Sequence, residues 1–315
     1  MSTIQVLAAG LQTTVQDLGR EGFGPVGVSP SGAADPISLR LGNRLVGNDE
    51  GAAALEMMLL GGTLTFPEGA VVALSGSDFG ATLDDTRLEA SMSVEVRPGQ
   101  TLRLGPTNSG ARCYLCVQGG IDVAPFLGSA STHILSGLGG FEGRALRKGD
   151  VVHLGSATRT KPFRKRTIAP QGSQHLFDRQ ILRVTPGPQV DWFSESSLRS
   201  FYRGSYRVGE QSNRMGLRLE GVAVAQRGTS SMITEGVSLG AIQVPVGGSP
   251  IILFVEQQTT GGYPKIANVI AADLHRVGQL RPRDEIRFEQ VTFDHARSLL
   301  IEQEKLLASG ELILE

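Results

Sequence analysis

The 315-residue chain has few of the features that mark nucleic-acid-binding or membrane proteins. Lys and Arg number 30 and Asp and Glu number 31, so a formal net charge of -1 gives little attraction to nucleic acid or to an anionic membrane. Aromatic residues make up only 5%, too few to suggest platforms on which bases stack. No apolar run approaches the roughly 18 residues of a membrane-spanning helix, and no signal peptide is visible. We therefore expect neither nucleic acid nor membrane as a partner.

Cysteine is scarce, with only Cys113 and Cys116 in the chain. Their C-x-x-C spacing occurs in redox and zinc sites, but a structural zinc usually has four ligands and no second pair exists. The flanking sequence is typical of a strand, where an offset of three residues places two side chains on opposite faces. We predict two buried free thiols and a cytoplasmic protein.

Motifs of self-contained catalytic sites are also missing. The sequence contains no G-x-x-x-x-G-K-[ST] loop, no H-E-x-x-H and no G-x-S-x-G. It has no Met-Lys-Met site for attaching biotin, and its five histidines lie far apart. We expect no metal centre, no biotin on this chain, and no activity of the chain by itself.

Glycine is abundant, with 41 residues that often fall in pairs between short apolar runs. Such glycines serve tight turns and bulges, so the pattern predicts a mainly β protein. The predicted strands are Ile4–Ala8, Thr63–Phe66, Ala70–Ser75, Ser93–Val96, Thr101–Leu104, Cys113–Gln118, Val151–Leu154, Ile181–Thr185, Leu217–Leu219, Ala241–Val244, Ile251–Val255 and Ile286–Phe288.

Helical patterns are few and short. Asp35 followed by Pro36 is a helix start, with Asp as the cap, and the helix should end at Gly47. We expect two further helices, over Ser194–Tyr202 and about Asp294–Ala308.

The chain divides by composition into an N-terminal β-barrel-like domain (1–158), a linker (159–176) and a C-terminal β-barrel domain (177–315). The linker is basic and contains proline, and a basic binding patch is its alternative interpretation. The segments LRKGDVVHL (Leu146–Leu154) and LRPRDEIRF (Leu280–Phe288) resemble each other. Either a duplicated β-barrel or chance similarity would give this likeness.

The first candidate site is EQQTTGGYPKI, Glu256–Ile266, which follows an apolar strand. Thr259 and Thr260 offer hydroxyls, and Gly261 and Gly262 allow backbone N–H groups to face an anion. Lys265 adds a charge for phosphate or carboxylate. Together they fit an oxyanion or phosphate cradle, although a polar β-turn would have the same composition.

Three other segments carry candidate residues. Asn213 and Arg214 in QSNRMGLRLEG suit a carboxylate, or Arg214 forms a surface ion pair. Asp17, Arg20 and Ser31 lie in a Gly-rich segment that leads into the helix capped by Asp35. A carboxylate at Glu56 would be an acid, a base or a metal ligand if buried, but we expect it to face solvent.

Several segments in order resemble one family, the biotin-dependent carboxyltransferase or allophanate hydrolase subunit 2 family. They are TTVQDLGR, PSGAAD, LVGNDEGAAALE, GGIDVAPFLGS with GLGGFEGRAL, TPGPQ, SNRMG-x-R-L-E-G, GAIQVP and QTTGGYPKIA. The resemblance runs from about Thr13 to Phe288. Within the family, a free-standing chain of this length resembles the C subunits of 5-oxoprolinases, a group also described as the antagonist of a kinase-inhibitor protein. Where that family has Asp before QTTGGYP, this chain has Glu256, and where PSGAMD is expected it has Ala34.

The resemblance implies two cyclophilin-like β-barrel lobes and an obligate partner, the B subunit of 5-oxoprolinase. Together with the A subunit, the complex converts 5-oxoproline to glutamate, using ATP with Mg²⁺. Two alternatives stay open. The chain is the carboxyltransferase component of a biotin-dependent urea or amide carboxylase, or a non-enzymatic regulator that binds a kinase-inhibitor protein.

Both family chemistries stabilise charge on the oxygen of an amide-like group. The hypothesis is therefore that Thr259, Thr260, Gly261 and Gly262, with Gln258 beside them, form an oxyanion hole. Lys265 and Arg214, assisted by Asn213, would hold phosphate or carboxylate, as would Arg20 and Ser31. Asp17 or Glu256 would handle protons or Mg²⁺.

Overall fold

The computed structural model describes residues 2–156, 163–169, 180–228 and 232–315. The chain forms two compact units. The first comprises Met1–Arg20, Ser31–Gln174 and Ser309–Glu315, and the second comprises Glu21–Pro30 and His175–Ala308. Most of the predicted linker, 159–176, lies outside the described residues.

Two sheets make up the first unit. The six-stranded sheet has the order β11 (Val151–His153), β1 (Thr3–Ala8), β4 (Thr63–Thr65), β9 (Thr101–Arg103), β6 (Thr82–Leu83) and β7 (Thr86–Arg87). The seven-stranded sheet has the order β2 (Gln12–Gln16), β3 (Ala54–Met58), β10 (Arg112–Val117), β5 (Ala70–Gly76), β8 (Met92–Val96), β12 (Thr167–Ile168) and β22 (Ile313–Leu314). All their pairings are antiparallel.

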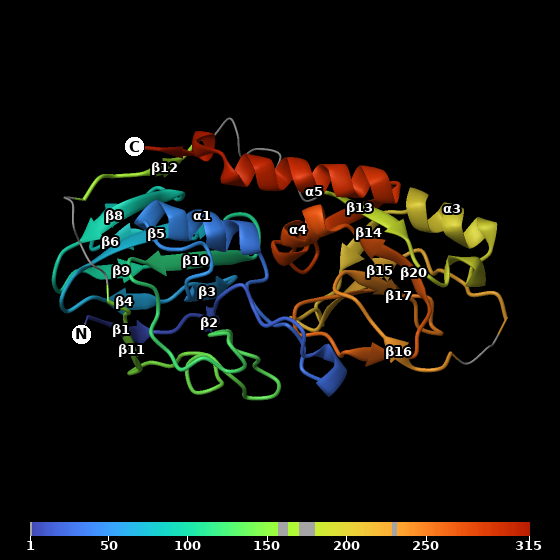
Figure 1. Cartoon of the computed structure of the whole chain (residues 1–315), viewed down its shortest axis with the longest axis horizontal. Coiled ribbons are helices and arrows are strands. Elements are labelled where there is room, and N and C mark those ends of the chain that lie inside the picture. Colours follow the sequence, from blue (N-terminus) through green and yellow to red (C-terminus); the bar gives the residue numbers. More distant parts are fainter. Residues whose placement is uncertain (1, 157–162, 170–179, 229–231) are drawn as a thin grey trace. The chain divides into compact units, whose positions relative to one another are not determined.

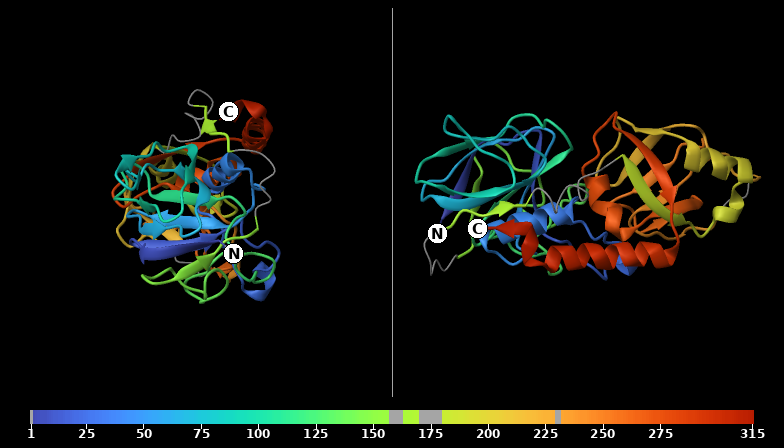
Figure 2. Two further views of the ribbon diagram at one scale, coloured as in Figure 1. Left: turned by 90° about the vertical axis from the view of Figure 1, so that its left-hand side faces the viewer. Right: turned by 90° about the horizontal axis from the view of Figure 1, so that it is seen from above.

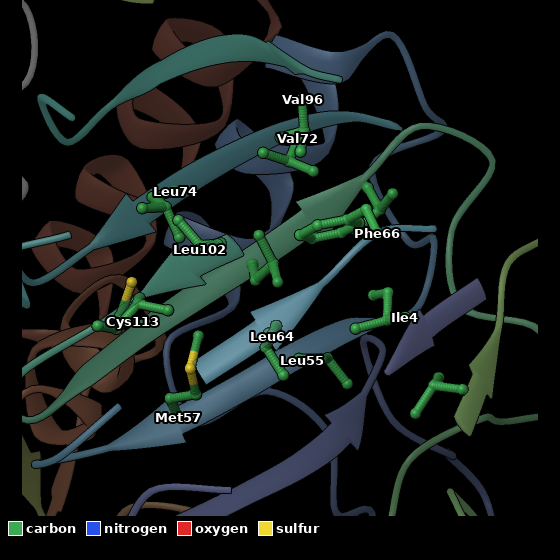
Figure 3. Packing of buried hydrophobic residues seen from close by; sticks show 14 of the residues in the cluster. Ile4, Leu55, Met57, Leu64, Phe66, Val72, Leu74, Val96, Leu102 and Cys113 are labelled. Atoms are coloured by element: carbon green, nitrogen blue, oxygen red, sulfur yellow. The ribbon is translucent and has the colours of Figure 1, made fainter. Parts of the chain in front are cut away.

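The core of the first unit contains side chains from both sheets. Figure 3 shows Ile4, Leu64 and Leu102 of one sheet gathered with residues of the other. Those labelled from the seven-stranded sheet are Leu55, Met57, Val72, Leu74, Val96 and Cys113. The alternation of each strand gives one sheet face to this apolar cluster.

Both cysteines are free and buried, which confirms that prediction. Cys113 joins the apolar cluster, whereas Cys116 points to the other face of β10, where its Sγ contacts the backbone oxygen of Leu39. Burial raises the pKa of the Cys113 thiol to about 12 and raises that of Cys116 as well. Neither thiol therefore has the thiolate character of a redox or metal site.

The first predicted helix is α1 (Pro36–Val46), which packs on β5 and β10 (Figure 1). Asp35 caps it by accepting hydrogen bonds from the backbone N–H and the hydroxyl of Ser38. Gly42 allows the close approach to the sheet, because a Cβ there would lie 2.4 Å from the Ser75 hydroxyl oxygen. The predicted cap, start and end of this helix are confirmed.

A closed seven-stranded barrel forms the second unit. Its order is β13 (Ile181–Pro186), β20 (Lys265–Val269), β17 (Ala241–Gln243), β18 (Ile251–Leu253), β15 (Gly216–Gly221), β14 (Tyr206–Val208) and β21 (Glu285–Gln290), which closes on β13. A separate ribbon pairs β16 (Glu235–Gly236) with β19 (Thr260–Gly261).

Three helices belong to the second unit among the described residues. They are α3 (Glu195–Arg203), α4 (Leu274–Gly278) and α5 (Phe293–Ala308). Figure 2 shows α3, in yellow, beside the barrel strands, where Phe201 stacks on Phe288 of β21 with ring centroids 4.7 Å apart. In the part of the chain that the structure describes, the other helical turns are short 3-10 segments at Gly24–Val26, Val190–Trp192, Ala271–Asp273 and Gly310–Leu312.

The predictions of a mainly β protein and of three helices are confirmed. The predicted strand Ile251–Val255 ends as β18 at Leu253. The short α4 was not predicted, nor were the strands β2, β3, β6, β7, β12, β14, β16, β19, β20 and β22. Among the described helices, none combines the length and apolar character that crossing a bilayer requires.

Candidate functional site

The segment from residue 254 to residue 264 connects two strands that flank the same neighbour. β18 and β20 both pair antiparallel with β17, so they run parallel to each other. A connection between parallel strands must return along their whole length to start the next strand. This topology makes residues 254–264, which include the Thr-Thr-Gly-Gly sequence, an extended connection rather than a tight hairpin. We call these residues the crossing segment.

The crossing is fixed to the ribbon strand β16. Gly261 pairs with Glu235 and Thr260 with Gly236, and the backbone N–H of Val237 donates to the Thr259 oxygen at 3.1 Å. The side chains of Gln258 and Thr260 remain exposed, Thr259 and Gly262 are half-buried, and Gly261 is buried. The segment therefore presents its hydroxyls at the surface of the second unit on a paired, defined backbone.

Lys265 begins β20 and is only 4% exposed. Its ammonium forms an ion pair with the carboxylate of Glu235, whose side chain is 46% exposed. Gln189 completes this cluster, because its Oε1 accepts from the Lys265 backbone N–H at 3.1 Å and its Nε2 donates to Glu235 Oε1 at 2.9 Å. The hydrogen bond from Lys265, and then that from Gln189, lower the pKa of Glu235.

Gln243, the last residue of β17, lies against the crossing segment. Its Oε1 accepts from Gln258 Nε2 at 3.3 Å. Its Nε2 is buried and has no hydrogen-bond partner among the described residues. A Cβ at position 261 would lie 2.4 Å from this Nε2, so any larger residue there would force the Gln243 side chain to move.

The sequence pointed to Lys265 but not to Gln189, Glu235 or Gln243. Gln189 and Gln243 lie in TPGPQ and GAIQVP, two of the segments that carry the family resemblance. The sequence signal that could have identified Gln243 is its position as a polar residue within the apolar run of a predicted strand.

Arg214 and Glu256 form a buried ion pair, with Nε and Oε1 2.5 Å apart. The backbone also links them, because the N–H of Glu256 donates to the Arg214 oxygen at 2.8 Å. The surface ion pair that we considered for Arg214 is therefore wrong: its side chain is only 5% exposed. The neighbouring Asn213 is exposed, and its Oδ1 accepts from the N–H of Met215.

Asp17 lies in the first unit, where its carboxylate holds a loop. It accepts from the backbone N–H groups of Gly19 and Ala130 and from the hydroxyls of Ser129 and Ser131, at 2.5 to 2.7 Å. Because the Asp17 carboxylate accepts four hydrogen bonds, it fixes the position of the loop that contains Ser129 and Ser131.

Arg20 and Ser31 contact the same loop. Arg20 donates to the backbone oxygens of Phe126 and Ser131 and lies over the Phe126 ring. The Ser31 hydroxyl donates to the Thr132 oxygen at 2.7 Å. The structure thus brings these three predicted residues together in the first unit, and it places the other nine in the second unit.

Glu56 does not face solvent, contrary to the prediction. It is 3% exposed and accepts from the Tyr114 hydroxyl at 2.7 Å and from the Ala34 backbone N–H at 2.9 Å. Arg112 supplies the counter-charge at 3.3 Å. β3 lies between β2 and β10, so even this polar side chain is covered. Among the described residues, no group of three or more His, Cys, Asp or Glu side chains is placed to hold a metal ion.

The sequence matches the family model "Carboxyltransferase domain, subdomain A and B" over residues 26–290. This chain therefore belongs to the carboxyltransferase domain family, as the resemblance of its motifs indicated.

Two curated relatives show the range of proteins that contain this domain. The chain is 38% identical to the C subunit of 5-oxoprolinase from Escherichia coli over 96% of each chain. It is 36% identical to urea amidolyase of Saccharomyces cerevisiae over 98% of this chain but only 18% of that protein.

Solved structures agree with the family assignment. The urea carboxylase of Kluyveromyces lactis matches with a TM-score of 0.89 and 35% identity, over 99% of this chain and 30% of that one. The fold of both units is therefore shared with a carboxylase component.

Proposed function

We propose that this chain is the C subunit of an ATP-dependent 5-oxoprolinase, which opens the lactam ring of 5-oxoproline to give glutamate. The observation that carries the proposal is the 38% identity to the C subunit of a 5-oxoprolinase over 96% of both chains. The corresponding chain of Haemophilus influenzae supports it with 37% identity over 94% of both chains.

The net reaction adds one water across the lactam C–N bond and hydrolyses one ATP. ATP with Mg²⁺ supplies the activation of the lactam oxygen, which makes the resonance-stabilised amide a better electrophile. Because the described part of this chain has no metal-ligand cluster, we assign no Mg²⁺ ligand to it.

The contribution of this chain is to hold the substrate and stabilise negative charge. Water adds to the activated carbon and the protonated ring nitrogen leaves as the amine, which gives an acyl phosphate. When a second water hydrolyses that acyl phosphate, negative charge grows on its carbonyl oxygen and on the departing phosphate. Each donor placed at such an oxygen typically contributes about 3–4 kcal/mol. We assign this role to the hydroxyls of Thr259 and Thr260 and the backbone N–H of Gly262, with Gln258 beside them, because they lie on the surface of the crossing segment while Gly261 is paired with Glu235.

Lys265 binds the negatively charged group of the substrate in this proposal. The Arg214–Glu256 pair supports the base of the crossing segment, since its two charges neutralise each other. Catalytic roles for Asp17, Arg20, Ser31 and Asn213 stay predictions from the sequence.

The proposed complex contains homologues of the A and B subunits of 5-oxoprolinase and acts in the cytoplasm. The two buried free thiols are consistent with a reducing compartment. A carboxyltransferase component of a urea carboxylase is the second candidate, and it is favoured by the match to urea amidolyase.

The test is reconstitution. The purified A and B subunits are incubated with 5-oxoproline and ATP, with and without this chain, and glutamate is measured. We expect product only when all three chains and ATP are present. Equal product without this chain would remove the proposal, and carboxylation of urea by this chain with a biotin carrier would select the second candidate.

Variants of the crossing segment test the assigned residues. Thr260→Ala should lower turnover of the assembled complex by roughly 10²–10³-fold, the usual effect of losing one oxyanion donor. Lys265→Ala should also lower turnover, because the negatively charged group of the substrate loses its counter-charge. Both variants should still co-purify with the partner subunits. Thr86→Ala, at an exposed threonine of β7 in the first unit, is the matched control. Unchanged turnover in both variants would exclude the assignment.

A further inference from the structure

Three side-chain donors lie beside the crossing segment of the second unit. Lys265 Nζ and Gln189 Nε2 both donate to the same oxygen, Oε1 of Glu235. Gln243 Nε2 is the third donor, and it lies next to Gly261, the residue that pairs with Glu235 across the ribbon. Gln243 and Lys265 are also direct partners on β17 and β20, so their side chains leave the sheet on the same face.

The donors are held in place before any ligand binds. The Gln189 amide is oriented because its oxygen accepts from the Lys265 backbone N–H, which directs its Nε2 to Glu235. The Gln243 amide is oriented because its oxygen accepts from Gln258, which leaves its buried Nε2 unpaired among the described residues. A buried donor without an acceptor is costly, so a ligand oxygen that reached it would bind strongly.

Glu235 differs from these donors in its exposure. Lys265 and Gln243 are 4% and 1% exposed, whereas the side chain of Glu235 is 46% exposed and belongs to a ribbon of only two residue pairs. Its carboxylate can therefore leave the cluster with little loss of packing. The depressed pKa of Glu235 shows that the cluster favours a negatively charged carboxylate.

We propose that Lys265, Gln189 and Gln243 form a recognition site for the carboxylate of a small ligand, and that Glu235 occupies this site until the ligand displaces it. Glu235 thus stands in for the ligand carboxylate and keeps the buried ammonium paired in the free protein. The identity of the ligand rests on the proposed function, which makes it the carboxylate of 5-oxoproline.

The experiment compares two probes on the full chain by isothermal titration calorimetry. 5-Oxoproline carries the carboxylate, and 2-pyrrolidinone is the same lactam without it. If Glu235 occupies the site about nine-tenths of the time, Glu235→Ala should bind 5-oxoproline about tenfold more tightly than the wild type. Binding of 2-pyrrolidinone should not change. Glu210→Ala is the control, since Glu210 is likewise an exposed glutamate in an ion pair, in its case with Arg283 at 2.7 Å.

The donors are tested in the Glu235→Ala background. Adding Gln243→Leu should weaken 5-oxoproline binding roughly tenfold, because a hydrogen bond to a charged group is lost. Adding Lys265→Met should abolish binding. Fluorescence of the single tryptophan, Trp192 of the second unit, checks that each variant is folded.

A chemical measurement gives a second criterion. Acetic anhydride should modify Lys265 slowly in the wild type and quickly in Glu235→Ala, and 5-oxoproline should protect it.

The proposal is overturned if Glu235→Ala binds 5-oxoproline no more tightly than the wild type, or if the affinity for both probes increases equally. Suppose that Glu235→Ala binds the carboxylate ligand as expected but that glutamate forms equally well without this chain. The proposed function would then be wrong, and the carboxylate site would stand. Conversely, suppose that glutamate formation needs this chain but that Glu235→Ala binds 5-oxoproline with the affinity of the wild type. The carboxylate site would then be wrong, and the proposed function would stand.

Discussion

The buried Arg214–Glu256 ion pair stabilises the start of the crossing segment. Their side chains are 5% and 2% exposed, so neither charge has water as an alternative partner. Removing one member of a buried pair takes the counter-charge away from the other, at a cost of about 3–5 kcal/mol. We expect Arg214→Met and Glu256→Gln each to lower the free energy of unfolding by that amount, measured by urea denaturation followed through Trp192 fluorescence.

Arg207→Met is the control for this prediction. Arg207 pairs with Glu220 at 2.8 Å, but both side chains are more than half exposed, so its loss should change stability little. The double variant Arg214→Met with Glu256→Leu should recover part of the stability, because both charges of the pair are removed together. An Arg214→Met variant as stable as Arg207→Met would contradict the structure.

At the level of the element, two turns with similar sequences have the same conformation. Asp150 accepts from the N–H of Arg147 at 2.7 Å, and Asp284 accepts from the N–H of Arg281 at 2.9 Å. The third residue of each turn has a positive φ, 93° at Gly149 and 74° at Arg283. Each turn leads into a strand, β11 or β21. The sequence likeness between the two halves therefore reflects a shared turn geometry.

Exchanging glycine and a larger residue at the third position of these turns should have opposite effects on stability. Gly149→Ala should destabilise the first unit by about 1–2 kcal/mol, because a Cβ is disfavoured at positive φ although nothing lies within 4 Å of it. Arg283→Gly should leave stability unchanged or raise it by up to about 1 kcal/mol. Thermal unfolding followed by circular dichroism measures both. Destabilisation by both substitutions would mean that backbone conformation does not decide the outcome.

At the scale of the whole molecule, the end of the chain belongs to the first unit although the preceding helix belongs to the second. β22 pairs with β12 at the edge of the seven-stranded sheet, and Leu312 is fully buried. The backbone oxygen of Ser309 accepts from Arg44 at 3.1 Å. The first unit therefore needs the segment Ser309–Glu315 to complete its sheet and core.

Truncation after Ala308 tests this dependence. Loss of the buried Leu312 should destabilise the first unit by about 2–5 kcal/mol. Hydrogen exchange measured by mass spectrometry should become faster in β8 and β12, while exchange in β17 and β20 stays the same. Equal acceleration in both units would show that the segment acts on the whole chain.

The sequence predicted those elements whose signals are local. The cap at Asp35, the helices expected over Ser194–Tyr202 and about Asp294–Ala308, and most strands follow from capping residues, apolar alternation and glycine turns. β2 and β3 were missed because their polar residues, among them Gln16 and Glu56, suggested loop or surface. These side chains are buried in the sheet, where Glu56 is paired with Arg112 and Tyr114.

By itself, the sequence determined the mainly β character, the buried thiols, the family and the location of the crossing segment, because each depends on residue types within a short stretch or on several stretches in order. Only the tertiary structure decided which polar groups face each other. Gln189, Glu235, Gln243 and Lys265 come from four separate segments, and pairing between strands that are distant in sequence brings them together. Contacts of this kind depend on which strands pair across long stretches of sequence, and the residue types within one short stretch do not decide that pairing.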